Sequence, residues 1–279
     1  FTHIGLDISP DVDTVIYTLS DMADRQRGWG LSGESWSFMG ALHKIGGETW
    51  FQLGDRDLAT HVERTHRMRQ GQTLSDVTVA LAAAHGISHA IAPMSDDPVR
   101  TMVTTAAGEL TFQEYFVREQ CRPPVSSIRF AGSDAAHPSP VFGNVLDRRD
   151  IGSVIICPSN PLLSIDPILA IPGVRSRLRS IGAPIVAISP IVGGKSIKGP
   201  TAKLMEELGI APTTLSIATH YGQLIDAIVI DEIDAADAAA LEALGLAVLV
   251  TKTVMSNIED SARLASQTVD FVRSLAAHQ

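Results

Sequence analysis

The chain has 279 residues, of which 45% are hydrophobic and 19% are charged, and its formal net charge is −9. This length allows one large α/β domain, or a core with one insertion. The acidic balance excludes a global basic field for nucleic acid, so an anionic ligand must bind through local Arg, Lys or backbone N–H groups.

No apolar run in the sequence has the length of a membrane span, and no signal peptide is visible. Two cysteines, Cys121 and Cys157, lie far apart and lack the spacing of metal ligands. We therefore expect both thiols to be reduced and structural, in a cytoplasmic protein without a zinc site.

The first third of the chain is predicted to be mainly helical. Apolar residues at helical spacing, with glycine or polar residues at the ends, predict four helices. They span residues 13–22, 37–45, 57–70 and 73–85. The glycine-rich stretch 24–36 is predicted to be a loop, and Trp50–Leu53 a short strand.

The middle of the chain changes to short β-rich pieces. Thr101–Thr105 and Leu110–Phe116 flank Ala107 and Gly108, which predicts a hairpin. Residues 121–140 are rich in Pro and Ser and lack a helical period. We expect this region to form an insertion, about residues 72–150, in a single domain that spans 1–279.

The second half alternates buried strands with helices. The predicted strands are Ser153–Cys157, Ile185–Ser189, Ala227–Asp231 and Ala247–Thr251, and the helices between them include 201–208 and 235–244. This alternation predicts an α/β fold with a Rossmann-like, mostly parallel sheet, helices on both faces and a small inserted subdomain. Ligands of such sheets bind at the carboxyl ends of the strands, so the loops PSNP, SPIVGGK, DEID and TKTVMS are candidate sites.

The motif SPDVDT begins at Ser9 and Pro10 and carries Asp11 and Asp13 just before a helix. In an extended lead-in these two carboxylates would point the same way and could share a hard cation. The alternative is that one of them caps the helix.

The motif LGDRDLATH places Arg56 between Asp55 and Asp57 at the start of a helix. Arg56 could clamp a phosphate or a planar heterocycle, with the two carboxylates holding it. Thr60 and His61 follow, and His61 falls on the same helical face as Asp57. The alternative is a surface cluster of ion pairs.

Two later loops carry further candidates. In PSNP, prolines fix the backbone around Ser159 and Asn160, and Pro161 follows, so Asn160 could read a base edge or a phosphate. In SPIVGGKSIKGP, Gly193 and Gly194 allow close backbone approach, and Lys195 and Lys198 add positive charge. The alternatives are a capped turn for the first loop and a flexible surface loop for the second.

Taken together, these motifs resemble the 2-phospho-L-lactate transferase family of coenzyme F-420 biosynthesis. The resemblance covers the chain from Ile8 to the last helix. It is carried, in this order, by ISPDVDTVIYTL, GDRDLATH, MSDDPV, FQEYFV, PSNPLLSIDPIL, SPIVGGKSIKGPTAKLM and DEID…TVMS.

The resemblance implies a cytoplasmic, Mg²⁺-dependent, often homodimeric transferase with small-molecule substrates. Its donor would be a guanosine diphosphate derivative of phospholactate, phosphoenolpyruvate or 3-phosphoglycerate, and its acceptor the deazaflavin Fo. The ribityl hydroxyl of Fo would attack the phosphorus next to the acid, and GMP would leave. Family members open with a strand and a glycine-rich phosphate loop that this sequence lacks, so we expect the opening of the domain to be missing.

The resemblance also implies roles for the candidate residues. Asp11 and Asp13 would hold Mg²⁺, and Asp13 and Arg56 would act in catalysis. The expected substrate-binding residues are Ser9, Pro10, Asp55, Asp57, Thr60, His61, Ser159, Asn160, Pro161, Gly193, Gly194 and Lys195.

Two other functions fit parts of the sequence. A non-catalytic, nucleotide-sugar-binding regulator of the same superfamily would share the loop around Ser159, Ser164 and Pro167. SPDVDT, GDRDLATH and MSDDP favour the transferase. A Rossmann dehydrogenase is disfavoured because no GxGxxG follows a strand.

Overall fold

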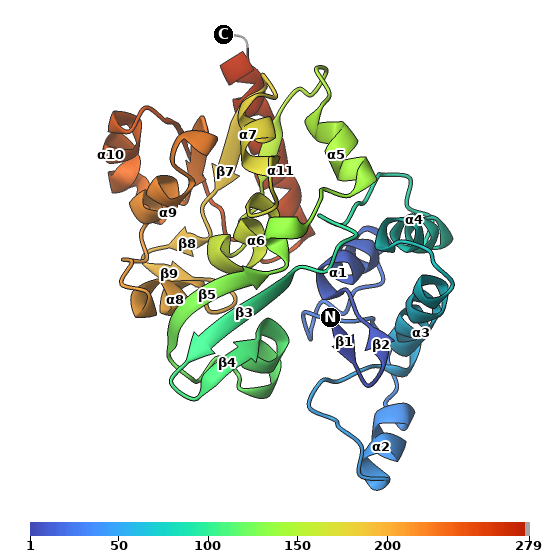
Figure 1. Cartoon of the computed structure of the whole chain (residues 1–279). Coiled ribbons are helices and arrows are strands. Elements are labelled where there is room, and N and C mark those ends of the chain that lie inside the picture. The colour runs from blue at the N-terminus through green and yellow to red at the C-terminus, as the bar shows by residue number, and fades with distance from the viewer. Residues whose placement is uncertain (277–279) are drawn as a thin grey trace.

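Four parallel strands form the central sheet in a computed structural model that describes residues 1–276 (Figure 1). In spatial order they are β11 (Ala247–Val250), β10 (Ala227–Ile230), β7 (Ile185–Ile188) and β6 (Val154–Ile156). Every residue of the two central strands is buried, as expected for parallel strands that helices cover on both faces. The four predicted strands are confirmed, and each is shorter by a residue at one or both ends.

Helices cover both faces of this sheet. On one face, Leu264 and Val272 of α11 (Ile258–Ala276) pack with Val186 and Val229. The other face packs against α7 (Val174–Arg179), α8 (Thr201–Glu207), α9 (Thr214–Tyr221) and α10 (Ala238–Ala243). Successive strand residues point to opposite faces, so the apolar runs of β7 and β10 supply both cores. The expected α/β architecture is confirmed.

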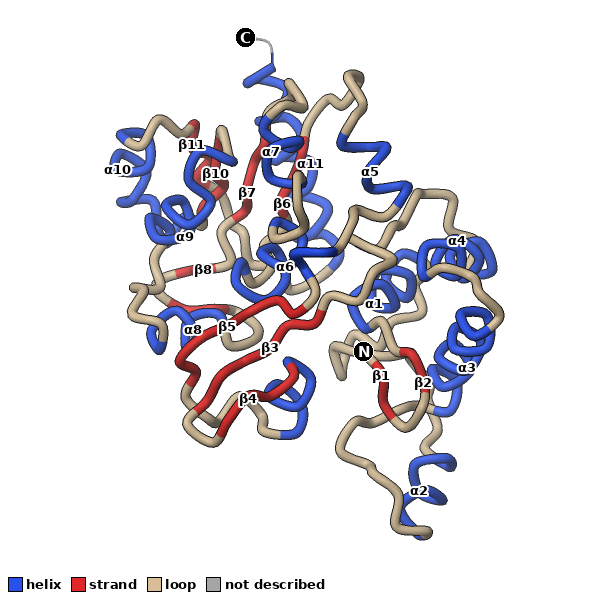
Figure 2. Tube along the Cα trace, viewed as in Figure 1, coloured by secondary structure: helices blue, strands red, loops and turns tan. Residues whose placement is uncertain are grey.

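An antiparallel sheet of three strands lies beside the parallel one (Figure 2). Its order is β4 (Gly108–Thr111), β3 (Arg100–Thr105) and β5 (Val125–Ala131). The predicted hairpin is confirmed, but its second strand ends at Thr111, and a π-helical turn, η1 (Glu114–Arg118), takes its place. The strand β5 was not predicted, because its exposed serines weaken the apolar signal.

This second sheet is not a separate core. Val103 of β3 and Val125 of β5 belong to the same buried cluster as Ile185 and Ile228 of the parallel sheet. The expected insertion at about 72–150 contains the whole antiparallel sheet, and its bounds stay a prediction.

Short strands and four helices make up the N-terminal part. They are β1 (Thr2–His3), β2 (Leu6–Asp7), α1 (Pro10–Leu19), α2 (Ser37–Lys44), α3 (Asp55–Arg69) and α4 (Leu74–Ala84). All four predicted helices are present. Helix α1 begins three residues early, with Pro10 in its first turn, where a missing N–H costs nothing.

The predicted strand Trp50–Leu53 is wrong. These residues form bends and pair with no strand in the described chain. Ring contacts hold the segment instead, since the Phe51 ring lies 5.0 Å from that of Phe1 and Leu53 is fully buried. The apolar side chains that suggested a strand serve to pack this segment against its neighbours, and its backbone does not pair with any described strand.

The remaining elements are short and connect the larger ones. They are η2 (Ser133–Ala135), α5 (Pro140–Leu146), η3 (Pro161–Ile165), α6 (Asp166–Leu169), β8 (Ile191–Val192), β9 (Lys195–Ser196), η4 (Gly222–Leu224) and η5 (Glu232–Asp237). Within the described residues, no helix combines the length and the apolarity that crossing a bilayer requires.

The packing of β10 predicts a large cost for truncating its centre. Ile228 is fully buried, so Ile228→Ala should lower the free energy of unfolding by about 2–5 kcal/mol. Ile155 lies on the edge strand β6 and is 37% exposed, so Ile155→Ala is the matched control and should cost much less. Urea unfolding of both variants measures the difference, and equal costs would contradict the described sheet order.

Candidate functional site

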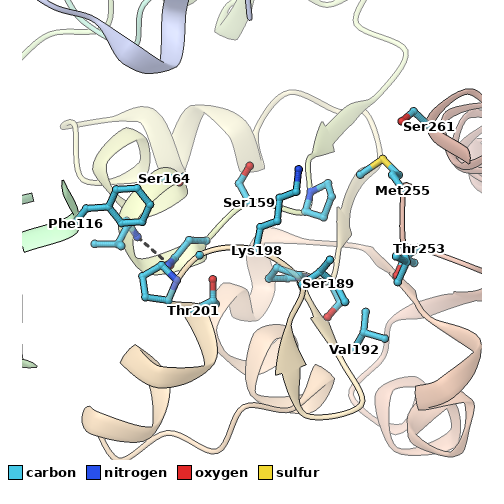
Figure 3. Close-up of a pocket in the computed structure, with 18 of the residues that line it drawn as sticks. Phe116, Ser159, Ser164, Ser189, Val192, Lys198, Thr201, Thr253, Met255 and Ser261 are labelled. Carbon is cyan, nitrogen blue, oxygen red and sulfur yellow. Dashed lines mark hydrogen bonds between the residues drawn. The ribbon is translucent and has the colours of Figure 1, made fainter. Parts of the chain in front are cut away.

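A pocket of about 600 Å³ lies at the carboxyl ends of the parallel strands (Figure 3). Three of the segments that line it follow β6, β7 and β11 directly: residues 158–160, 189–190 and 253–255. Because parallel strands end at the same edge of a sheet, these segments meet although they are far apart in sequence. Three of the four loops expected to carry a site therefore line one cavity.

Asn160 lines this pocket, and the oxygen and the NH₂ group of its side chain have different surroundings. Its side-chain oxygen accepts from the backbone N–H groups of Leu162 at 2.9 Å and Leu163 at 3.2 Å, and so caps η3. Its side-chain NH₂ is buried and has no partner in the described part of the protein. Asn160 can therefore give hydrogen bonds to a ligand acceptor but has little acceptor capacity left. Its neighbour Ser159 also lines the pocket, whereas Pro161 is buried and is not part of the lining.

Lys198 is the ionisable side chain among the described residues that line the pocket. The other polar lining groups are hydroxyls and the Asn160 amide. Figure 3 shows the Lys198 chain reaching into the cavity beside Ser159. The lining thus combines one positive charge with neutral donors.

The structure does not bring Lys195 into this lining, nor Gly193 or Gly194. Both glycines have positive φ and form the turn between β8 and β9, and all three residues are exposed. The chain returns to the pocket three residues later, at Lys198. The sequence indicates that this loop is positively charged. It does not indicate which of the two lysines lines the pocket, because that depends on the turn between β8 and β9.

The fourth candidate loop, DEID, does not line the pocket among the described residues, but it is hydrogen bonded to two of the loops that do. The buried carboxylate of Asp231 accepts hydrogen bonds from the backbone N–H of Thr253 at 2.7 Å and from its hydroxyl at 3.1 Å. Although burial opposes its charge, the hydrogen bonds from Thr253 and Ile233 hold the pKa of Asp231 below its ordinary value. Asp234 accepts from the Gly193 N–H at 3.0 Å. These carboxylates position two of the pocket loops.

The residues expected in the N-terminal motifs form a second, separate cluster that does not line the pocket. Asp13 of α1 is buried and accepts hydrogen bonds from both terminal nitrogens of Arg64, one of them at 3.1 Å. Arg64 on α3 is 1% exposed and also approaches the carbonyl of Asp7. Burial raises the pKa of Asp13, and the charge of Arg64 opposes this rise. Arg64 is absent from the predicted site residues, because nothing local in the sequence marks it as the partner of Asp13.

Asp57, Thr60 and His61 extend this cluster along α3. The buried Tyr17 hydroxyl is hydrogen bonded to Asp57 at 2.6 Å and to the Thr60 hydroxyl at 2.9 Å. His61 Nε2 lies 3.3 Å from the Asp57 carboxylate, which confirms that these two residues share a helical face. Although burial opposes it, hydrogen bonds from His61 and Tyr17 hold the pKa of Asp57 below its ordinary value.

An extended segment would have pointed Asp11 and Asp13 the same way, and the structure shows that they do not. They lie two positions apart within α1, so Asp13 faces α3 while Asp11 is exposed. The described residues contain no group of three or more His, Cys, Asp or Glu side chains arranged to hold a metal. A cation shared by Asp11 and Asp13 does not fit this arrangement, since Arg64 occupies both oxygens of Asp13.

Neither carboxylate of GDRD holds Arg56, so that expectation is wrong: Asp57 contacts Tyr17 and His61, and Asp55 caps a helix. Asp55 accepts from the backbone N–H groups of Ser37 and Phe38 at the start of α2, each at 3.0 Å. Glu34 in turn accepts from the N–H groups of Arg56 and Asp57, each at 2.8 Å, at the start of α3. The start of α2 is therefore capped by the first residue of α3, and the start of α3 by a carboxylate from the segment that leads into α2.

Arg56 itself is exposed, and its guanidinium donates to the carbonyl oxygen of Ser32 at 2.8 Å. The alternative of a surface ion-pair cluster also fails, because neither neighbouring carboxylate pairs with Arg56. Ser9 and Pro10 form the N-terminus of α1, where the Ser9 side chain makes no capping bond.

The sequence of this chain is similar to known proteins over nearly its full length. The family described as 2-phospho-L-lactate transferase CofD matches residues 2–266. A 2-phospho-L-lactate transferase from Methanosarcina mazei is 38% identical over 262 residues, which cover 94% of this chain and 85% of the relative. A phosphoenolpyruvate transferase from Kitasatospora aureofaciens is 38% identical over 267 residues, covering 94% and 83%.

A solved structure shares the fold at low sequence identity. The protein BH3568 from Bacillus halodurans superimposes with a TM-score of 0.57 at 12% identity, over 93% of this chain and 85% of that one. At this identity the likeness supports the arrangement of the elements only.

The Arg64–Asp13 contact predicts a strong loss of stability when it is broken. Arg64→Met leaves a buried carboxylate without its counter-charge, which should cost about 3–5 kcal/mol of unfolding free energy. The cost should shrink as the pH falls, because loss of Arg64 raises the pKa of Asp13 further and the neutral acid is easier to bury.

Chemical denaturation at several pH values measures this effect. Arg25→Met is the matched control, since Arg25 pairs with Asp21 on the exposed surface and should change stability little. Adding Asp13→Asn to Arg64→Met should restore part of the stability. A small cost for Arg64→Met that does not depend on pH would show that the pair is not the anchor described.

Proposed function

The chain belongs to the 2-phospho-L-lactate transferase CofD family, and from this premise we propose that it transfers a phospho-acid from a guanosine diphosphate derivative to the deazaflavin Fo. Membership supports a transferase with small-molecule substrates. We propose, beyond family membership, that these are its donor and acceptor and that the reaction belongs to coenzyme F-420 biosynthesis.

The proposed reaction needs alignment and charge neutralisation more than a protein nucleophile. The terminal ribityl hydroxyl of Fo attacks the phosphorus attached to the acid, and its proton is released. A new P–O bond forms to Fo, the P–O bond to the guanosine side breaks, and GMP leaves. The product is a phosphodiester between Fo and the acid.

One observation carries the proposal: among the described residues, the lining of the pocket at the strand ends offers hydrogen-bond donors and positive charge but no carboxylate. Lys198, the free NH₂ of Asn160 and several hydroxyls line it. Such a lining complements phosphate oxygens, which accept hydrogen bonds. It would also stabilise the negative charge that develops on these oxygens during transfer. We assign the diphosphate of the donor to Lys198 and Asn160, with Ser159 beside them.

The N-terminal residues have a different place in the proposal. Asp13 and Arg56 remain predicted catalytic residues, and Asp11 offers an exposed carboxylate. Mg²⁺, which would neutralise phosphate charge when bound, remains a prediction from the resemblance. Because Arg64 engages both oxygens of Asp13, no step of the reaction is assigned to a metal held there. Homodimer formation and a cytoplasmic location also remain predictions.

The choice of acid is open between the relatives, whose names include both a 2-phospho-L-lactate transferase and a phosphoenolpyruvate transferase. We therefore expect one of the guanylylated acids (phospholactate, phosphoenolpyruvate or 3-phosphoglycerate) to give a product with Fo whose mass equals Fo plus the phospho-acid minus water. Mass spectrometry of the mixtures, run over a range of Mg²⁺ concentrations, measures this. Fo that is neither bound nor converted, as its fluorescence would show, would support the regulator instead.

The pocket lining predicts that Lys198, and not Lys195, binds the donor. Lys198→Ala removes a charge-assisted contact to phosphate, which is worth about 1.5–3 kcal/mol, so kcat/KM should fall roughly 10- to 150-fold. Lys195→Ala carries the same charge change at an exposed residue outside the lining and should keep near-normal kcat/KM. Initial rates with varied donor test both variants. Equal losses would show that the loop acts through its overall charge.

A further inference from the structure

Three large apolar side chains that are exposed to solvent converge on one cavity. Phe116 is 42% exposed, Ile197 54% and Met255 42%, and all three line the pocket at the strand ends. Exposed apolar side chains that occur singly are normal on a protein surface, but a set that shares one cavity marks a ligand site. The pocket therefore has apolar walls in addition to its phosphate-binding lining.

The most defined of these walls is aromatic. The rings of Phe112 and Phe116 lie 5.3 Å apart at an interplanar angle of 30°, and both line the pocket. Phe112 packs against the ring of Phe116. The Phe116 side chain nevertheless remains partly exposed and available to a ligand.

The π-helical turn η1 holds Phe116 in place. Tyr115, its neighbour, is fully buried, and its hydroxyl accepts a hydrogen bond from Lys203 Nζ at 3.2 Å. At the start of the turn, Glu114 accepts from the N–H of Thr111 at 3.0 Å. Because Tyr115 faces the core, the next side chain projects toward solvent and the cavity. The ring is thus presented on an anchored backbone.

The arrangement along the cavity separates apolar ends from a charged middle. Figure 3 shows Phe116 at one end and Met255 at the other, with Ser159 and Lys198 between them. A ligand that carries a planar ring on one side of a phosphate would meet the charge and an apolar wall together.

We propose that Phe116, supported by Phe112, is a stacking platform for a fused planar heteroaromatic ring of a substrate. This inference rests on the proposed function, whose two such rings are the deazaflavin of Fo and the guanine of the donor. Both rings are flat and have large π faces, so either would gain from an offset stack on phenylalanine. The ring that stacks here lies at the Phe116 end, with the phosphate groups toward Lys198.

The test compares ring binding by two phenylalanine variants of the full chain. Phe116→Leu keeps an apolar side chain but removes the aromatic face. Phe130→Leu is the matched control, since Phe130 lies on β5 and does not line the pocket. Dissociation constants for Fo, by its fluorescence, and for GDP, by calorimetry, are measured with both variants and the parent protein.

We expect Phe116→Leu to weaken binding of one of the two ligands by about three- to tenfold, while Phe130→Leu leaves both constants unchanged. A loss confined to Fo assigns the platform to the deazaflavin, and a loss confined to GDP assigns it to guanine. The melting temperature should change little, because the Phe116 side chain is exposed.

Two binding results would overturn the inference in different ways, and light scattering distinguishes two cases of the first. Unchanged constants for both ligands in Phe116→Leu remove the platform but leave the proposed function intact. Absence of binding of either ligand by the parent protein removes the proposed function together with the platform. Unchanged ligand binding with loss of a dimer, seen by light scattering, would make the aromatic wall an interface between copies of the chain.

Discussion

The parallel pairing of four short strands is the constraint on which the rest of the structure depends. Because β6, β7, β10 and β11 run the same way, the segments that follow them emerge at one edge of the sheet. Burial of β7 and β10 on both faces stabilises this arrangement, because helices cover their Val and Ile side chains on either side of the sheet. The pocket is a consequence of that geometry, with DEID supporting it through Asp231.

Acidic residues in the N-terminal part mainly join helices. Asp13 fastens α1 to α3 through Arg64, and Asp55 and Glu34 cap α2 and α3 reciprocally. These carboxylates satisfy buried or terminal N–H groups that would otherwise be costly. The same residues have the pattern expected of a metal site, because carboxylates serve both as ligands of a hard cation and as caps of helix N–H groups. Local pattern cannot separate these uses, whereas the partner of each oxygen does.

The pocket combines features suited to a substrate with both charged and aromatic parts. Lys198 and the free amide donor of Asn160 lie among hydroxyls, and Phe116 and Met255 stand at opposite ends. Two separate regions of the chain supply these ends, namely the antiparallel sheet with η1 and the loop after β11. The antiparallel unit therefore contributes a wall of the cavity as well as part of the common core.

The sequence by itself determined the α/β class, the four parallel strands, the main helices and the loops that line the pocket, because these depend on local periodicity and on the direction of parallel strands. Tertiary structure alone decided the side-chain partners. It paired Asp13 with Arg64, 51 residues away, and brought Lys198, but not Lys195, into the lining of the cavity. It also left Trp50–Leu53 without a partner strand among residues 1–276. Such contacts depend on how distant segments meet, and no local spacing encodes that.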